Sequence, residues 1–288
     1  KAAFAQSINS VAVKLGQEVG IENIITTAKA MGIKSKLDAT PSLTLGASDV
    51  NLLELVNAYA TAANDGKMHE PVLVTRIVDR NGNEIYKAPT EQRQALSAKS
   101  AFLVQKLLMG GMREPGGTSM NLWRYVGKYN DTEFGGKTGT SNNHSDAWFV
   151  GVSPKLVAGA WVGGEYRSIH FRTGQLGQGS RTALPICGYF FESVLGDPDF
   201  KKYHGKFSGP GADVDYGMYT CASYYQRRDS DSIASDSIAT PDMETIKNDG
   251  GEPYATDNNN ATPPPAHSDR HQGEATENKK TAVDDVYF

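Results

Sequence analysis

Apolar side chains recur at helical spacing in several segments of the chain. In the first segment the apolar positions are Ala2, Phe4, Ile8, Val11, Ala12 and Leu15. Such spacing predicts one helix over 1–19, and the same pattern predicts helices over 24–31, 49–60, 97–109 and 182–195. Asp49 and Ser97 stand where they can cap the third and fourth of these helices. Glycines at 110, 111, 116 and 117 are expected to end the fourth.

Alternating and continuous apolar runs elsewhere predict strands. The runs 72–78 and 84–87 are joined by Asn81-Gly82, which is typical of a hairpin turn. Three further runs, 134–141, 146–153 and 155–164, follow one another with very short links. Short links require antiparallel neighbours, so these runs predict a three-stranded meander. Both of its faces are apolar, which indicates helices on both sides and an α+β fold.

Composition and charge divide the chain into two parts. The 288 residues carry a net charge of −4, but 226–288 hold 6 basic and 13 acidic residues, a net of −7. That segment has few large apolar side chains, so we predict a disordered acidic low-complexity tail over 226–288 and a folded domain over 1–225. The tail is either a solvated extension or an acidic interaction segment, and 281–288 is a candidate docking segment within it.

The composition also excludes several classes of protein. The acidic balance argues against nucleic-acid binding, because the footprint of such proteins is basic. The apolar runs are too short to cross a membrane, and no membrane contact is expected from this segment. Two cysteines exclude a disulfide scaffold and a Cys-rich zinc module, and no metal or other cofactor is predicted. Cys187 is expected to be a buried thiol, with a bond to Cys221 as the alternative.

The first strand of the predicted meander carries the string Gly136-Lys137-Thr138-Gly139-Thr140-Ser141. Lys137 offers a positive field, the hydroxyls of Thr138 and Thr140 can hold a carboxylate, and Gly139 lets a substrate backbone lie close. A lone Lys-Thr-Gly triplet occurs by chance. The longer string, followed by Ser-Asp-Ala-Trp-Phe at 145–149, is specific.

This string and other stretches resemble the C-terminal part of the transpeptidase domain of bifunctional (class A) penicillin-binding proteins. The other stretches are 4–13, 41–48, 59–66 and 156–163. The resemblance covers nearly all of the predicted folded part and none of the tail. It implies the penicillin-binding and serine β-lactamase type of fold, an antiparallel sheet flanked by helices, here truncated at the N-terminus.

The resemblance also implies a role for each motif residue. Ser7 and Asn9 would form the Ser-x-Asn motif, in which Ser7 relays a proton and Asn9 hydrogen-bonds the bound peptide. Lys137 would hold Ser7 by a hydrogen bond. Thr138, Gly139 and Thr140 would bind the carboxylate end of a D-Ala-D-Ala stem peptide or a β-lactam, and the Thr140 N–H would form half of the oxyanion hole. A donor of that kind stabilises a transition state by about 2.7–4 kcal/mol.

Each assignment has a plainer alternative. Ser-x-Asn occurs three times, at 7–9, 119–121 and 141–143, and Ser7 is preferred for its helical setting and its place ahead of Lys137. Otherwise Ser7 is a serine on a helix surface and Lys137 an exposed strand lysine. We interpret His144 as a solvated turn residue rather than a general base. Trp148 and Trp161 are interpreted as sheet-packing side chains.

The nucleophile of the family is missing from the sequence. It belongs to a Ser-x-x-Lys motif that precedes Ser-x-Asn, and no serine here has a lysine three positions later. We therefore expect a fragment that cannot acylate alone, from a parent that also carries a glycosyltransferase domain and a membrane anchor and works outside the cytoplasmic membrane. A complete protein that lost the chemistry is the alternative.

Three functions remain open on the sequence. The first is a peptidoglycan D,D-transpeptidase, which is favoured because the second motif reads Ser-Ile-Asn rather than Ser-Asp-Asn. The second is a hydrolase with the same motifs, a D,D-carboxypeptidase or a β-lactamase. The third is a non-catalytic β-lactam-binding module.

Overall fold

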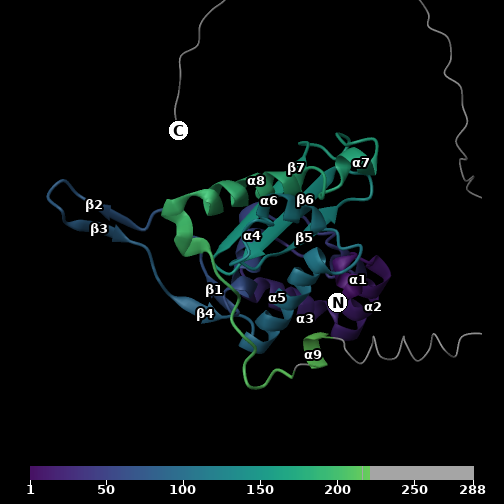
Figure 1. Ribbon diagram of the computed structural model, residues 1–288, viewed down its shortest axis with the longest axis horizontal. Helices are drawn as coiled ribbons and strands as arrows, with labels where there is room; N and C mark the ends of the chain where they lie inside the picture. Colours follow the sequence, from purple (N-terminus) through teal and green to yellow (C-terminus); the bar gives the residue numbers. More distant parts are fainter. Residues whose placement is uncertain (216, 221–288) are drawn as a thin grey trace, which may run out of the picture. The chain divides into compact units, whose positions relative to one another are not determined.

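The structure is a computed structural model that describes residues 1–215 and 217–220 (Figure 1). The chain divides into two units, Lys1–Ser235 and Asp236–Phe288, and all described residues belong to the first. The predicted tail 226–288 and Cys221 lie outside the described residues, so the domain boundary at 225 and the proposed disulfide stay predictions.

Helices and strands alternate irregularly along the described part. The helices are α1 Ala2–Ala5, α2 Asn9–Val19, α3 Ile21–Ala30, α4 Leu52–Ala63, α5 Ala98–Arg113, α6 Trp123–Val126, α7 Gly174–Gly177, α8 Ala183–Gly196 and α9 Gly217–Thr220, with 3₁₀ turns η1 Pro41–Leu45, η2 Met120–Leu122 and η3 Pro198–Tyr203. The strands are β1 Lys67–His69, β2 Arg76–Val78, β3 Glu84–Lys87, β4 Gln92–Gln94, β5 Gly135–Thr140, β6 Asp146–Ser153 and β7 Leu156–Gly163.

The predicted meander is confirmed. Strands β5, β6 and β7 form one antiparallel sheet in that order, with Lys137 opposite Val150 and Val150 opposite Gly159. β6 is the central strand, and nearly all of its residues are buried. β5 is an edge strand, so one side of its backbone has no partner strand in the described part of the chain.

Helices cover both faces of this sheet, as expected from its apolar residues (Figure 1). On one face Phe149 packs with Phe191 of α8 in a core cluster that also contains Val126 of α6. On the other face Val152 packs with Leu108 of α5 and with side chains of α1 and α4. Phe149 and Val152 point to opposite faces because side chains alternate along a strand.

The single helix predicted over 1–19 is wrong in its middle. The chain leaves α1 after Ala5, turns through Ser7 in the left-handed region at φ 58°, and starts α2 at Asn9. Apolar residues continue at helical spacing across the turn, although Ile8, Val11 and Leu15 are largely exposed in the structure. The periodic pattern therefore does not reveal a break of three residues.

The helix caps are partly as predicted. Ser97 caps α5, as expected, by accepting a hydrogen bond from Ser100 N. α4 is capped by Asn51, which accepts from Leu53 N, so the prediction of Asp49 was wrong. The glycines at 110 and 111 do not end α5. It runs to Arg113 and stops two residues before Pro115, where the chain before proline disfavours helix.

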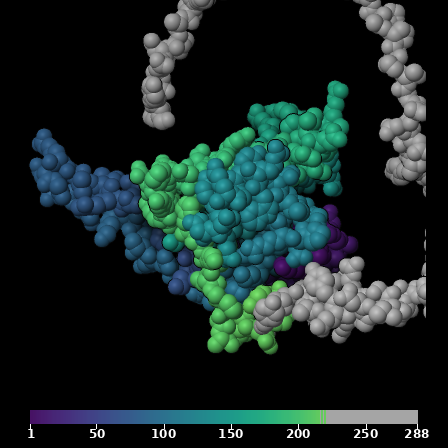
Figure 2. All heavy atoms as spheres, viewed as in Figure 1, coloured from purple at the N-terminus to yellow at the C-terminus, as the bar shows by residue number. Residues whose placement is uncertain are grey.

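Two small two-stranded sheets complete the fold. The predicted hairpin is confirmed as β2 and β3, although β2 begins at Arg76 rather than at 72. It projects from the rest of the described chain as an exposed arm (Figures 1 and 2). The pairing of β1 with β4 was not predicted, because strands of three residues show no alternation long enough to recognise.

Candidate active site

Ser7 and Lys137 meet although they lie 130 residues apart. The Lys137 ammonium donates a hydrogen bond of 2.8 Å to Ser7 Oγ. Lys137 comes from the edge strand β5, and Ser7 from the turn between α1 and α2. The two residues that the sequence singled out in separate motifs are therefore brought together by the fold.

The turn that carries Ser7 is held by the loop that follows α5. The carbonyl of Ala5 accepts a hydrogen bond of 3.0 Å from Thr118 N. Gln6 Nε2 donates to Pro115 O at 2.9 Å. A positive φ at a non-glycine residue is costly, of order 1–3 kcal/mol, and persists where the surroundings impose it. These two bonds hold the two residues that precede Ser7 and so help to fix Ser7 in that conformation.

Lys137 has no carboxylate partner among the described residues. Its ammonium donates to Ser7 Oγ and, at 2.7 Å, to its neighbour's carbonyl, Thr138 O. Burial lowers the pKa of Lys137 to about 8, because desolvation disfavours the charged form. A substantial fraction of Lys137 is therefore neutral at pH 8 and can accept a proton.

The hydroxyls of Thr138 and Thr140 are each fixed by a group from another segment. Thr138 Oγ1 donates to Thr118 Oγ1 at 2.7 Å. Gly179 N donates to Thr140 Oγ1 at 3.1 Å. Thr138 and Thr140 lie two apart on one strand, so their side chains share a face of the sheet. Thr140 Oγ1 keeps its proton to donate to a carboxylate, and Thr138 Oγ1 can donate to the same carboxylate when its bond with Thr118 Oγ1 runs in the opposite direction.

Sequence reasoning missed Thr118 and Gly179. Thr118 follows the pair Gly116-Gly117, and a Cβ on Gly117 would lie 2.3 Å from Gly111 O, so this loop packs tightly against α5. A Cβ on Gly179 would lie 2.5 Å from Gly139 O and 2.2 Å from Trp148 O. Gly117 and Gly179 were the signals available in the sequence, because each glycine allows a close approach of two backbones.

The outer edge of β5 offers backbone groups to a ligand. Ser141 N donates inward to Asp146 O at 3.0 Å. N–H groups of successive residues on a strand point to opposite sides, so those of Thr140 and Thr138 face away from β6. A Cβ on Gly139 would lie 3.1 Å from Trp148 Cβ, so the packing of Trp148 also requires a small residue there.

The side chain of Asn9 makes no hydrogen bond within the described part of the chain. It is exposed and begins α2, two residues after Ser7. The structure therefore places Asn9 beside the cluster of Ser7, Lys137, Thr138 and Thr140 without joining it. Its side chain is available to a ligand.

Three other side chains can be compared with their sequence interpretation. His144 lies in the β5–β6 turn at φ 60°, but it is half-buried against Gly174 and Gly177, so it is not simply a solvated residue. Its Nδ1 is buried without a hydrogen-bond partner.

Trp148 and Trp161 lie with ring centroids 6.4 Å apart, and Trp161 donates to Asp146 Oδ1 at 3.0 Å, which confirms their sheet-packing role.

Other features of the described part bear on the sequence predictions. Cys187 is a buried free thiol, and burial raises its pKa to about 12. Residues 1–215 and 217–220 contain no group of three or more His, Cys, Asp or Glu side chains placed to hold a metal ion. In the same residues, no helix combines the length and apolar character needed to cross a membrane.

Comparisons with known proteins point to one family. Residues 1–163 match the penicillin-binding protein transpeptidase domain. The chain is 37% identical over 162 residues to penicillin-binding protein 2D of Bacillus subtilis (strain 168), covering 56% of this chain and 23% of that protein. It is 35% identical over 184 residues to penicillin-binding protein 1A of Aquifex aeolicus (strain VF5), covering 64% and 24%.

Solved structures agree. The chain resembles penicillin-binding protein 1A from Haemophilus influenzae with a TM-score of 0.62 and 27% identity, covering 72% of this chain and 35% of that one. It shares the fold of PonA1 from Mycobacterium tuberculosis, solved in complex with penicillin V, with a TM-score of 0.60 and 22% identity over 75% of this chain and 60% of that one.

The chain spans about a quarter of the length of the curated relatives. The matched region contains the turn that carries Ser7 and the whole of β5. With an α+β fold, a half-buried lysine on an edge strand and a serine held against it, the chain belongs to the penicillin-binding protein transpeptidase domain family.

Proposed function

We propose that the chain supplies the substrate-binding and proton-transfer part of a peptidoglycan D,D-transpeptidase site, which also binds penicillin. The observation that carries the proposal is the contact of 2.8 Å between Lys137 Nζ and Ser7 Oγ beside an open strand edge. A lysine of lowered pKa bonded to a serine hydroxyl is a unit that can move a proton.

The substrate in this proposal is a stem peptide that ends in D-Ala-D-Ala. Its terminal carboxylate binds to the hydroxyls of Thr138 and Thr140, within the positive field of Lys137. Its backbone lies along the outer edge of β5 past Gly139, and Asn9 hydrogen-bonds one of its amides. The outward N–H of Thr140 then points to the carbonyl under attack and stabilises the oxyanion.

The reaction is an acyl transfer. A serine hydroxyl attacks the carbonyl of the penultimate D-Ala, and the bond from that carbonyl carbon to the terminal D-Ala nitrogen breaks. The leaving amine needs a proton, and Ser7 relays it with Lys137 as its hydrogen-bonded neighbour. The acyl group then passes from the serine oxygen to the amine of a second stem peptide. The ester bond breaks as the new amide bond forms, the amine loses a proton, and the serine oxygen takes up a proton and is released as the hydroxyl.

The attacking serine is the part of this machinery that the printed sequence lacks. No serine of the 288 residues is followed by lysine at the third position. We propose that the nucleophile belongs to a longer parent protein of the class A type, with a glycosyltransferase domain and a membrane anchor. Its transpeptidase domain would lie on the outer face of the cytoplasmic membrane. Penicillin-binding protein 1A of Aquifex aeolicus, of which the chain covers 24%, is long enough to contain such additional parts.

Fluorescent-penicillin labelling of the 288-residue chain tests the absence of a nucleophile. We expect no covalent adduct with the folded chain, and an adduct would overturn the assignment. In the parent protein, product analysis with a stem-peptide substrate separates the two enzymes: a cross-linked dimer indicates a transpeptidase. Released D-Ala alone indicates a carboxypeptidase and contradicts the proposal.

A further inference from the structure

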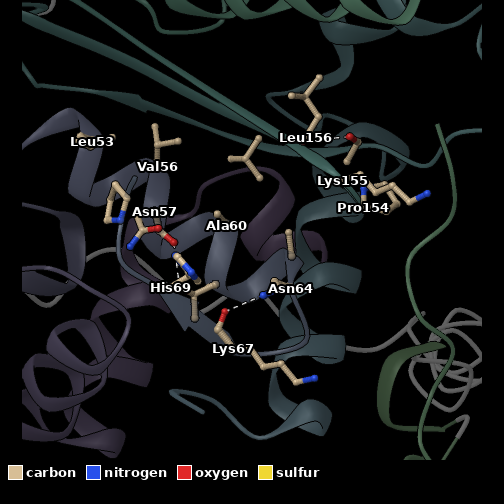
Figure 3. A pocket seen from close by; sticks show the side chains of 15 residues that line it. Leu53, Val56, Asn57, Ala60, Asn64, Lys67, His69, Pro154, Lys155 and Leu156 are labelled. Carbon is tan, nitrogen blue, oxygen red and sulfur yellow. Dashed lines mark hydrogen bonds between the residues drawn. The ribbon is translucent and has the colours of Figure 1, made fainter. Parts of the chain in front are cut away.

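A groove lies far along the sheet from the Ser7–Lys137 contact. It has a volume of about 400 Å³ and runs over α4, between β1 and the turn that joins β6 to β7 (Figure 3). Thr140 pairs with Ala147 at one end of β6, whereas this turn follows Ser153 at the other end. The groove is therefore separate from the candidate active site, and its volume falls in the range of ligand sites.

One stripe of α4 forms the floor. Leu53, Val56, Ala60 and Asn64 follow one another at intervals of three or four residues, so they lie along one side of the helix. Leu156 of β7 adds a further apolar side chain. Leu53 and Asn64 are eleven residue steps apart, about 16 Å at 1.5 Å per step, which equals about five residues of an extended peptide.

The ionisable side chains on the walls are two lysines and one histidine. Lys67 and His69 flank Met68 on β1, and because Met68 is buried in the core the two outer side chains face the groove. Lys155 stands on the opposite wall, in the β6–β7 turn. Figure 3 shows the ammonium groups of Lys67 and Lys155 directed away from Leu53 and Val56. No Asp or Glu lines the groove.

Both lysines are exposed, and neither makes an ion pair within the part of the chain that the structure describes. An apolar floor with unpaired cations on its rim complements a ligand with aliphatic groups and negative charges. Extended peptides with alternating aliphatic and acidic side chains have this character, because alternate side chains point to opposite sides.

We propose that this groove binds a short, extended, acidic segment of a partner protein. Aliphatic side chains of the segment lie on the α4 stripe, and its carboxylates face Lys67 and Lys155. The groove would thus be a docking site for a protein that acts together with the transpeptidase domain. This proposal does not depend on the proposed function of the Ser7–Lys137 site.

Fluorescence anisotropy with a labelled Asp-Val-Asp-Val-Asp peptide and the full 288-residue chain tests the proposal. We expect binding that weakens as salt is added, and no binding of a labelled Lys-Val-Lys-Val-Lys peptide. The double variant Lys67→Glu/Lys155→Glu should weaken binding at least tenfold. The double variant Lys87→Glu/Lys206→Glu changes two exposed lysines outside the groove by the same charge and should change binding less than twofold.

A second variant tests the floor. Ala60→Met places a larger side chain in the groove without altering any charge, and it should weaken binding while circular dichroism shows an unchanged fold. The proposal fails if the acidic peptide does not bind, or if the two double variants lose affinity equally. It also fails if a stem peptide ending in D-Ala-D-Ala displaces the probe, because the groove would then take cell-wall substrate rather than a protein segment.

Discussion

Lys137 keeps its ammonium half-buried beside hydroxyl and carbonyl oxygens, with no carboxylate partner in the described residues. A carboxylate at that point would raise the pKa of the lysine and neutralise the field that a substrate carboxylate needs. Burial alone instead lowers the pKa to about 8. Burial of Lys137 therefore costs some folding stability. In the proposed function, the same burial yields a lysine that both attracts an anion and accepts a proton.

The lowered pKa of Lys137 predicts that the stability of the fold depends on pH. The pKa of Lys137 is about 8 in the folded chain and about 10.4 in the unfolded chain. Below pH 8 the lysine is charged in both states, so the destabilising effect of its buried ammonium is then present in full. The effect is relieved as the pH rises from 8 to about 10.5, because the unfolded state then binds more protons. Relative to Lys137→Met, the free energy of unfolding should rise over this window by on the order of 1–3 kcal/mol.

Urea unfolding of both chains at pH 7, 8, 9 and 10 measures this difference. Groups that titrate identically in the two chains, such as Tyr59, whose pKa burial raises to about 12, cancel in the comparison. Parallel stability curves for the two chains would show that Lys137 titrates as it does in the unfolded chain. The burial argument would then be wrong.

Prediction from sequence at this scale worked for residues with a strict chemical requirement. The string around Lys137 and the Ser-x-Asn motif at Ser7 are two separate family motifs, and the structure brings Lys137 and Ser7 into contact. Thr118 and Gly179 could not be found, because they act through contacts with Thr138 and Thr140 across 20 and 39 residues. Nothing in a one-dimensional pattern joins such pairs.

Elements position these residues through close backbone contact. β5 carries glycines at 135 and 136, and a Cβ on either would lie within 2.8 Å of atoms of α5 or of Phe149. α5 and the sheet core therefore approach β5 more closely than any larger side chain allows. This close packing fixes the strand that holds Lys137.

Gly136→Ala tests that packing. Its Cβ would lie 2.7 Å from Phe149 Cζ, and Phe149 is fully buried, so the ring must shift. Overpacking of this kind costs about 1–3 kcal/mol, and the melting temperature should fall accordingly. Gly209→Ala is the matched control, because nothing lies within 4 Å of its Cβ. Equal melting temperatures for the two variants would contradict the account.

The cap of α4 gives a second test at this scale. Asn51→Ala removes the hydrogen bond to Leu53 N and should cost about 1 kcal/mol in the free energy of unfolding. Asn51→Asp keeps a capping oxygen and should cost much less. Asp49→Ala removes only an exposed ion pair with Arg167 and should also cost less. If Asp49→Ala lowers the free energy of unfolding more than Asn51→Ala does, Asp49 rather than Asn51 caps α4, as the sequence suggested.

Elements were predictable where the pattern was long. The meander and α8 followed from runs of eight residues or more, and the β2–β3 hairpin from its Asn-Gly turn. The break at Ser7 was missed because hydrogen bonds from Thr118 and Gln6, contacts with a distant loop, impose the turn. Local periodicity carries no information on such tertiary constraints.

Across the described residues, the fold separates the proposed active site from the proposed docking groove. One end of the meander holds Ser7, Lys137 and the two threonines. The other end borders the cationic groove over α4. The chain matches about a quarter of each curated relative, and none of its serines is followed by lysine at the third position. The central claim is therefore that β5 recognises the carboxylate of a D-Ala-D-Ala peptide.

An NMR titration of the ¹⁵N-labelled chain with diacetyl-Lys-D-Ala-D-Ala tests this claim most directly. We expect the amide signals of Thr138, Gly139 and Thr140 to shift with the D-peptide and not with the same peptide ending in L-Ala-L-Ala. Thr140→Val should weaken the effect roughly tenfold or more, the loss of one hydrogen bond to a charged group. If no β5 amide responds, or if the L-peptide shifts the same signals equally, the claim is contradicted.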